Sequence, residues 1–165
     1  MESSLPAAPV SAHAEVDIAA SAREVWTVIA DIASWPTWNP AVRQAVFGGQ
    51  LDVGARFRYS TPFGSMSCRL TRVDAPTAFA FSGRLLMMRQ LHAWQIDPVP
   101  GGVHVATDAT MSGISARLFH TRLRQRLQGE LDALVQLLKL EAEARVTEAG
   151  EEAARRGAAG EGEGR

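Results

Sequence analysis

Hydrophobic and polar residues alternate through short stretches in the first two thirds of the chain, whereas near its C-terminus hydrophobic residues recur every three or four positions. A period of two is typical of strands with one buried face, and a period near 3.6 is typical of amphipathic helices. We therefore predict seven strands, and the alternating stretches that define them cover residues 12–18, 41–47, 55–60, 65–73, 77–83, 89–96 and 103–111.

Turn-forming residues separate the last six of these stretches. They are Gly48-Gly49, T-P-F-G at 61–64, D-A-P at 74–76 and D-P-V-P-G-G at 97–102. Such residues favour tight turns, which leave no room for the helical crossovers that parallel strands need. The pattern therefore predicts an antiparallel meander.

Two stretches have helical periodicity. Residues 21–32 open with a capping box, Ser21 followed by Glu24, and then carry apolar residues at helical spacing. A long helix is predicted over residues 115–145, with an apolar stripe made by Phe119, Leu123, Leu127, Leu131, Leu134, Val135 and Leu138. The stripe fits either packing against the sheet or a coiled-coil dimer, although its spacing is nearer 3.6 to 4 than a strict heptad.

The segment W-P-T-W-N-P at residues 35–40 follows the first helix. Pro36 and Pro40 each lack an N–H and restrict the preceding residue, so we expect a rigid corner instead of continued helix or strand. The two tryptophans either seal one end of the sheet, or one of them forms part of a pocket wall. Asn39 is expected to cap the turn.

The order of these elements suggests an α+β fold: two short helices after the first strand, then a curved seven-stranded antiparallel sheet wrapped around a long C-terminal helix. Because such a sheet bends away from the helix along part of its length, a cavity is expected between them.

This order, together with W-P-T-W, G-R-L-L-M-M-R-Q-L-H-A-W-Q-I and P-G-G-V-H-V-A-T-D-A-T-M-S-G, resembles the START-like (SRPBCC, helix-grip) superfamily, and most of all its polyketide cyclase/dehydratase-like branch. The resemblance covers residues 12–145. It implies the helix-grip fold and a hydrophobic ligand. Relatives include polyketide aromatase/cyclases, lipid and quinone carriers, hormone-binding proteins and chaperone activators, so the fold alone does not fix the chemistry.

Strand alternation predicts which side chains face the cavity. A hairpin with Asp97 opposite Gly102 places His92 opposite Thr107, and the turn at Asp74 places Cys68 opposite Gly83. His104 and Asp108 then face solvent. The residues predicted to point inward are Phe57, Tyr59, Met66, Cys68, Leu70, Phe79, Phe81, Gln90, His92, Trp94, Ile96, Thr107 and Met111.

This inner face is apolar with a few polar groups, as small-molecule sites usually are. His92 and Tyr59 are the candidate catalytic residues; the alternatives are a hydrogen-bonded interior histidine and a core tyrosine. Cys68 has no evident base nearby and is interpreted chiefly as a small buried hydrophobe. The candidate ligand-binding residues are Trp35, Trp38, Phe57, Met66, Cys68, Phe79, Phe81, Arg84 near the mouth, Gln90, Trp94, Thr107 and Met111.

Composition and charge narrow the partners. The formal net charge of −1 gives no electrostatic reason to expect binding to nucleic acid or to an anionic membrane. The chain contains no run of 18 apolar residues, so membrane insertion is not expected. The four histidines and one cysteine are too scattered for a metal site, and no cofactor motif occurs. The N-terminus lacks a secretory signal pattern, so a cytoplasmic location is expected.

Composition also divides the chain. Residues 1–10 are expected to be flexible, residues 11–146 to form the helix-grip domain, and residues 147–165, with little apolar surface, to form a disordered tail.

Three functions fit these observations. The first is an enzyme that folds and cyclises or dehydrates a polyketide-like or aromatic molecule in the cavity. The second is a non-catalytic carrier or sensor of a lipid, quinone or other apolar metabolite, and the third is a protein-interaction module with a filled interior and an exposed apolar patch. A homodimer is compatible with each.

Overall fold

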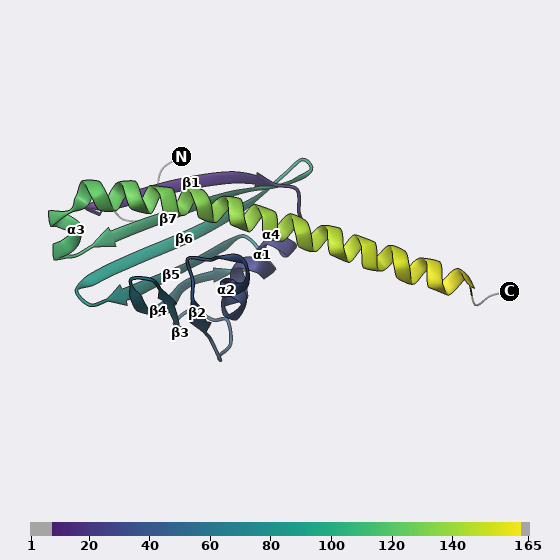
Figure 1. Cartoon of the computed structure of the whole chain (residues 1–165), viewed down its shortest axis with the longest axis horizontal. Helices are drawn as coiled ribbons and strands as arrows, with labels where there is room; N and C mark the ends of the chain where they lie inside the picture. The colour runs from purple at the N-terminus through teal and green to yellow at the C-terminus, as the bar shows by residue number, and fades with distance from the viewer. Residues whose placement is uncertain (1–7, 163–165) are drawn as a thin grey trace.

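A long C-terminal helix lies along one face of a curved seven-stranded sheet in the computed structural model, which describes residues 8–162 (Figure 1). All neighbouring strands are antiparallel, in the order β1-β7-β6-β5-β4-β3-β2. The predicted α+β helix-grip architecture is thereby confirmed. The elements are β1 Val10–Ile18, α1 Ala22–Ala30, η1 Ile32–Ser34, α2 Trp35–Trp38, β2 Gln44–Val46, β3 Arg56–Thr61, β4 Gly64–Asp74, β5 Ala78–Leu85, β6 Met88–Val99, β7 Gly102–Ser112, α3 Ile114–Leu118 and α4 His120–Gly162.

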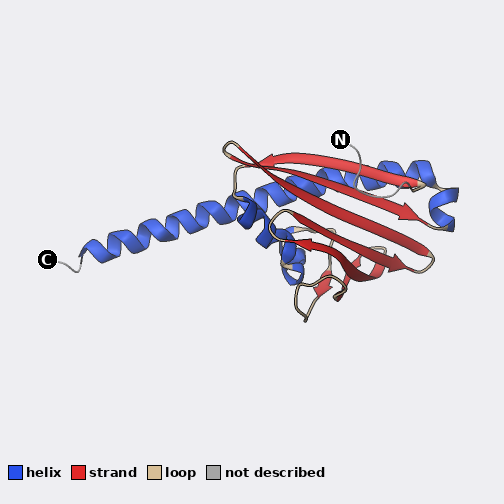
Figure 2. Ribbon diagram, turned by 180° about the vertical axis from the view of Figure 1, so that it is seen from behind, coloured by secondary structure: helices blue, strands red, loops and turns tan. Residues whose placement is uncertain are grey.

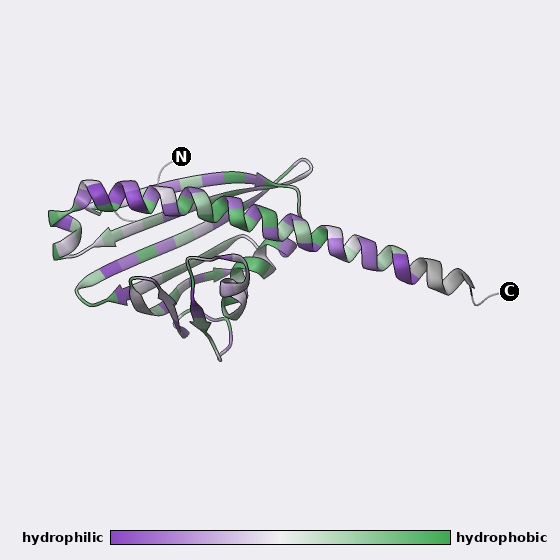
Figure 3. Cartoon of the chain, viewed as in Figure 1, coloured by the Kyte–Doolittle hydropathy of each residue, from purple (hydrophilic) through white to green (hydrophobic). Residues whose placement is uncertain are grey.

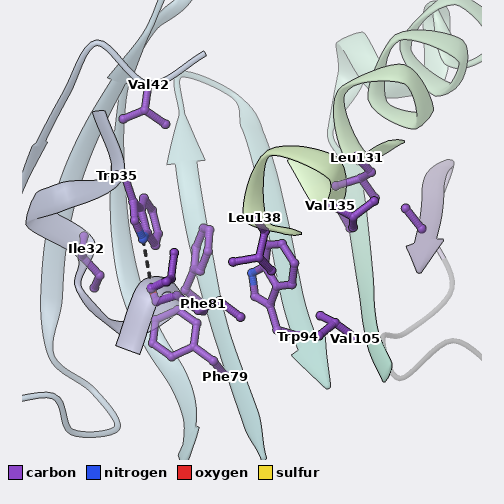
Figure 4. Close-up of a cluster of buried hydrophobic side chains, with 14 of the residues drawn as sticks. Ile32, Trp35, Val42, Phe79, Phe81, Trp94, Val105, Leu131, Val135 and Leu138 are labelled. Carbon is purple, nitrogen blue, oxygen red and sulfur yellow. Dashed lines mark hydrogen bonds between the residues drawn. The ribbon is translucent and has the colours of Figure 1, made fainter. Parts of the chain in front are cut away.

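The core lies between the inner face of the sheet and α4. Seen from behind, the outer face of the sheet is crossed by none of the helices that the structure describes (Figure 2). Leu131, Val135 and Leu138 of α4 are buried, and Figure 4 shows Leu138 beside Trp94 of β6. The apolar stripe of α4 is therefore covered within one chain, which leaves little of it for a coiled-coil partner.

The predicted strand faces are correct, although one register is not. Cys68 pairs with Gly83, as predicted. In the β6–β7 hairpin, however, Trp94 and not His92 pairs with Thr107, a shift of two residues. The strands continue to Val99 and Gly102, and Gly101, at φ 83°, allows a tighter turn between them. Because strand side chains alternate with a period of two, this shift leaves every inward residue facing inward.

The W-P-T-W segment forms one helical turn, α2, which is separated from α1 by η1 and is the second of the two short helices expected after the first strand. Pro36 lies in the first turn of α2, where a missing N–H breaks no intrahelical hydrogen bond. The Asn39 side chain accepts a hydrogen bond from the Ala41 N–H at 3.0 Å, which ends the turn as expected.

The C-terminal helical region differs from the prediction at both ends. A break after Leu118 separates α3 from α4 and leaves Phe119 57% exposed instead of on the buried stripe. Helix α4 passes Arg145, where we expected it to end, and continues to Gly162. Ion pairs one turn apart, such as Glu151 with Arg155 at 3.4 Å, support this exposed extension. The division between a domain at 11–146 and its flanks stays a prediction, and residues 1–7 and 163–165 lie outside the described part of the chain.

His104 and Asp108, which were expected at the surface, take part in an ion-pair array on the outer face of the sheet. Asp108 is buried, and its carboxylate lies 3.0 Å from His13 Nδ1. Glu15 lies 3.4 Å from His13 and 3.5 Å from His104, whose Nδ1 lies 2.7 Å from Asp17. Strands β1 and β7 pair in a register that places these side chains side by side, and β1 could not be paired from the sequence alone.

This array contributes stability that is lost as the pH rises through neutrality, whereas the buried His92, whose pKa is lowered to about 4, contributes stability that is lost as the pH falls. Burial alone lowers the pKa of His13, but hydrogen bonds to Asp108 and Glu15 raise it overall; the hydrogen bond to Asp17 raises the pKa of His104. A raised pKa stabilises the fold fully below the unfolded value of about 6.5, and that stabilisation disappears above the folded values. His104→Gln should therefore lose more stability in denaturant unfolding at about pH 5.5 than at about pH 8.5, by less than about 1 kcal/mol per ion pair, and the contribution of His92 cancels in this comparison with the wild type. Equal losses at the two pH values would contradict the assignment.

Candidate functional site

A cavity of about 420 Å³ lies between the sheet, α4 and the corner that follows α1. Its volume is within the range of small-molecule sites. The interior is therefore not solidly packed, contrary to what the protein-interaction hypothesis requires. The lining residues are Ile29, Trp35, Trp38, Asn39, Pro40, Ala41, Val42, Tyr59, Thr61, Phe81, Gln90, His92, Trp94, Arg126, Leu127, Gly129, Glu130, Leu131, Ala133, Leu134 and Leu137.

The structure brings together seven of the residues that sequence reasoning proposed for the site. They are Trp35, Trp38, Tyr59, Phe81, Gln90, His92 and Trp94. The other seven do not line the cavity: Phe57, Met66, Cys68, Phe79, Arg84, Thr107 and Met111. Their roles in ligand binding stay predictions that this geometry does not favour.

Most of the seven proposed residues that do not line the cavity still face inward as predicted, but other side chains separate them from it. The ring of Trp35 packs edge-on against Phe57, with centroids 5.6 Å apart, and Trp26 of α1 covers Phe79 in the same way at 6.0 Å. Thr107 is fully buried and bonded to His92. Met66 and Cys68 lie against Gly83, Met111 is half-buried near the end of β7, and Arg84 is exposed close to the β5–β6 turn.

Sequence reasoning missed two parts of the lining. One is the corner from Asn39 to Val42, which was expected to lie near the entrance but was not assigned to ligand binding. The other is the face of α4 around Leu127, Leu131 and Leu134, which was predicted only to pack against the sheet. The stripe itself was the available signal, because a helix held away from a curved sheet lines the gap as well as the core.

The two tryptophans of the corner behave differently. Trp35 donates its indole N–H to the Ile29 carbonyl at 3.0 Å, as the dashed line in Figure 4 shows. Trp38 is also buried, but its Nε1 is the one buried side-chain nitrogen or oxygen of the described residues that has no hydrogen-bond partner. A buried donor without an acceptor costs about 1–3 kcal/mol. Trp38 therefore lines the cavity with an indole whose N–H forms no hydrogen bond with the described residues.

His92 is held by Thr107 and presents one nitrogen for other contacts. Its Nε2 lies 2.8 Å from Thr107 Oγ1, the hydrogen bond anticipated from the sequence, and that hydroxyl donates to the Ala93 carbonyl at 3.0 Å. Thr107 must therefore accept from His92, which places the proton on Nε2 and the lone pair on Nδ1. Burial lowers the pKa of His92 to about 4, so the imidazole is neutral at pH 7. Its ring stacks on Trp94, with centroids 5.2 Å apart.

Two further polar groups line the cavity. Tyr59 donates its hydroxyl to the Met66 sulfur, a weak acceptor, at 3.1 Å, and burial raises the pKa of this phenol so that it stays protonated. Gln90 lines the cavity, and its side-chain amide forms no hydrogen bond with another described residue. Cys68, outside the lining, is no nucleophile at neutral pH, because burial raises the pKa of its thiol to about 12.

The charged groups of the lining pair with each other at its edge. Arg126 Nε lies 2.8 Å from Glu130 Oε1, and the same guanidinium lies 3.5 Å from the ring centre of Phe63 in the β3–β4 turn. This contact links α4 to the sheet where both border the cavity. The interior itself is thus apolar, with uncharged hydrogen-bonding groups.

Metal and membrane-spanning roles have no support in the part of the chain that the structure describes. Residues 8–162 contain no group of three or more His, Cys, Asp or Glu side chains arranged to hold a metal ion. None of the described helices is long and apolar enough to cross a membrane.

Comparison with known proteins bears on fold and family. Residues 9–143 match the family model described as "Polyketide cyclase / dehydrase and lipid transport". No curated protein matches the chain by sequence.

Several solved structures share the fold. A hypothetical protein from Helicobacter pylori is 14% identical with a TM-score of 0.74, the match covering 86% of this chain and 99% of that one. The di-domain ARO/CYC StfQ of the steffimycin biosynthetic pathway is 16% identical with a TM-score of 0.70, and the match covers 84% of this chain and 52% of StfQ. A START superfamily protein from Mycobacterium smegmatis is 14% identical with a TM-score of 0.59, over 78% of this chain and 98% of that one. At these identities the similarities establish the fold alone.

Proposed function

Because the chain belongs to the polyketide cyclase/dehydrase and lipid transport family, we propose that it binds a polyketide-like or aromatic molecule carrying carbonyl groups in its cavity and promotes cyclisation or dehydration of that molecule. The observation that carries the proposal is the buried N–H of Trp38, a residue of the cavity lining, which has no hydrogen-bond partner among the described residues. A hydrocarbon ligand would leave this donor unsatisfied, whereas a carbonyl oxygen would accept from it. Family membership implies a hydrophobic ligand, and Trp38 favours an oxygenated one.

The aromatic lining suits a flat ligand. Phe81, His92 and Trp94 all line the cavity, with neighbouring ring centroids 5.3 Å and 5.2 Å apart. Aromatic contacts contribute about 0.5–1.5 kcal/mol beyond the burial of area. A conjugated or aromatic ligand would profit from this wall more than a saturated chain of the same volume.

An aldol cyclisation would divide the work among three side chains. Nδ1 of His92 takes a proton from a methylene between two carbonyls, and the resulting enolate carbon attacks a second carbonyl. The imidazolium then returns its proton to the new alkoxide, which leaves a hydroxyl group. The N–H of Trp38 donates a hydrogen bond to an oxygen on which negative charge develops, and so does the O–H of Tyr59 after it exchanges its weak acceptor, the Met66 sulfur, for that oxygen.

Dehydration would use the same groups. His92 removes a second α-proton, the enolate expels the hydroxyl group, and the imidazolium protonates the departing oxygen as water. Methylenes between two carbonyls are already acidic, which lowers the demand on the base. Tyr59 acts as a donor in each step, because its raised pKa keeps the phenol neutral.

A non-catalytic carrier or sensor of a lipid or quinone is the second candidate, and the state of the titratable groups favours it. The low pKa of His92 makes it a weak base, and Glu130, the one carboxylate of the lining, is paired with Arg126. A carrier needs only the cavity and hydrogen-bonding groups that orient the cargo. A cytoplasmic location and a homodimer stay predictions from the sequence in either case.

Native mass spectrometry of protein purified from its own host should detect a bound apolar molecule with at least one carbonyl group. Extraction and identification of that molecule separate the two candidates. A cyclised or dehydrated product supports catalysis, and an abundant metabolite recovered chemically unchanged supports carriage. A bound molecule without any oxygen would contradict the role given to Trp38.

A further inference from the structure

Five large hydrophobic side chains are exposed at one end of the sheet, away from the projecting end of α4. Leu86 and Met87 form the β5–β6 turn, and Ile114, Leu118 and Phe119 belong to α3 and the break after it. Leu86 is 96% exposed and Leu118 is 71% exposed. We call these five residues the apolar tip. Figure 3 shows its hydrophobic colour beside the hydrophilic first turns of α4.

The two parts of the apolar tip are held together by the backbone. A Cβ on Gly113, immediately before α3, would clash with the Met87 carbonyl, so the two segments are in contact there. Leu86 lies in the left-handed region, with φ 53°. A hairpin turn at such a position favours Asn or Gly, which adopt this conformation with less strain. A leucine there is costly both conformationally and in exposed apolar area, and its 96% exposure shows that packing against the described residues does not offset this cost.

Arginines flank the residues of the apolar tip in the sequence, and no acidic residue lies among them. Segments 83–92 and 112–129 contain Arg84, Arg89, Arg117, Arg122, Arg124 and Arg126 and no Asp or Glu. The formal net charge of −1 therefore combines +6 in these two segments with −7 in the rest of the chain. Except for Arg126, which pairs with Glu130, these arginines form no ion pair with a carboxylate of the described residues.

We propose that the apolar tip and its flanking arginines dock the protein on the surface of a bilayer containing anionic lipid. Exposed apolar side chains would enter the boundary between headgroups and acyl chains, and the arginines would lie at the level of lipid phosphates. A protein partner would need an apolar centre with acidic residues around it. An anionic bilayer offers both features everywhere on its surface, because negatively charged headgroups cover apolar acyl chains. The net charge of the whole chain did not indicate a membrane-binding surface, because it sums the two basic segments and the acidic remainder of the chain.

Docking in this orientation places the cavity near the bilayer. Arg126 lines the cavity, stacks on Phe63 and lies in the same basic segment as Arg122 and Arg124. An apolar ligand leaving the membrane would then have only a short path into the protein. The docking surface itself does not depend on which ligand the cavity holds or on whether any chemistry follows.

Vesicle co-sedimentation tests the proposal. The full chain should pellet with vesicles of phosphatidylglycerol and phosphatidylcholine and partition at least about tenfold less onto phosphatidylcholine alone. Added salt should weaken binding, because it screens the arginines. A protein that stays in the supernatant with anionic vesicles would overturn the proposal, as would equal binding to both vesicle types.

Matched variants locate the surface. L86N/M87S and R117Q/R124Q should each reduce partitioning onto anionic vesicles about tenfold or more, and both lie outside the cavity lining. V53N is the control, because Val53 is 65% exposed in the loop between β2 and β3, far from the β5–β6 turn in sequence. Binding that survives both double variants, or that V53N reduces equally, would show that another surface is responsible. Native mass spectrometry of the same variants should still find the bound molecule, which keeps failure of docking distinct from failure of the cavity.

Discussion

The His92→Ala variant is expected to lose cyclisation activity by about a hundredfold or more while it keeps its ligand affinity within a few-fold. General-base catalysis contributes about 10²–10⁴ to rates. Within the lining, His92 is the one histidine, and it has a neutral nitrogen whose lone pair is free of any hydrogen bond. Ligand affinity rests mainly on the apolar walls and on Trp38, which this substitution leaves in place.

A second variant separates chemistry from folding. His92 is buried between Phe81 and Trp94, so truncation to alanine leaves a hole in the core. His92→Phe preserves an aromatic ring against Trp94 and removes both nitrogens, and Thr107 retains its hydrogen bond to the Ala93 carbonyl. Turnover of an aromatic poly-β-ketone should fall in both variants, whereas His104→Phe on the outer face should retain it.

The pH profile gives a readout that a structural role would not produce. With a pKa of about 4, His92 is in its basic form at neutral pH, so turnover should be constant near neutrality and decline as the pH falls toward 4. Unchanged turnover in His92→Phe would remove this residue from the mechanism and leave carriage as the better hypothesis.

Alternation and turns were sufficient to predict the strands and their faces. Cys68 pairs with Gly83 as expected, although the turn pairs Asp74 with Ala78 and a bulge between Leu70 and Arg72, which the sequence did not predict, shifts the register by one residue. The β6–β7 turn was displaced by two residues, yet Trp94 still faces the cavity, since a shift of two preserves the face. This error in register therefore did not change the face of the sheet from which a side chain was expected to project.

The extent of the cavity could not be predicted in this way. Alternation shows that Phe57 and Phe79 face inward, but it does not show that Trp35 and Trp26 cover them. Those contacts depend on where α1 and α2 cross the sheet, which no local pattern encodes. The opposite error occurred for Asp108, which was assigned to the surface because the pairing partner of β1 was unknown.

The difference between Trp35 and Trp38 leads to a paired prediction. In Trp38→Phe, affinity for benzoylacetone, an aromatic diketone, should fall about tenfold, because the ligand carbonyl loses its buried donor. The free energy of unfolding should change by no more than about 1 kcal/mol, since the variant also loses the cost of an unsatisfied N–H, which offsets part of the lost packing. Titration calorimetry and denaturant unfolding measure the two quantities.

Trp35→Phe should show the reverse order of effects. It removes the donor to the Ile29 carbonyl and loosens the contacts of Trp35 with Phe57 and Tyr59, so the free energy of unfolding should fall by about 1–3 kcal/mol. Affinity for benzoylacetone should stay within about threefold, because this N–H is already used within the protein. Butylbenzene, which has no oxygen, should bind wild type and Trp38→Phe alike. If Trp38→Phe weakened both compounds equally, the indole would contribute only packing, and the inference that the ligand carries a carbonyl group would lose its foundation.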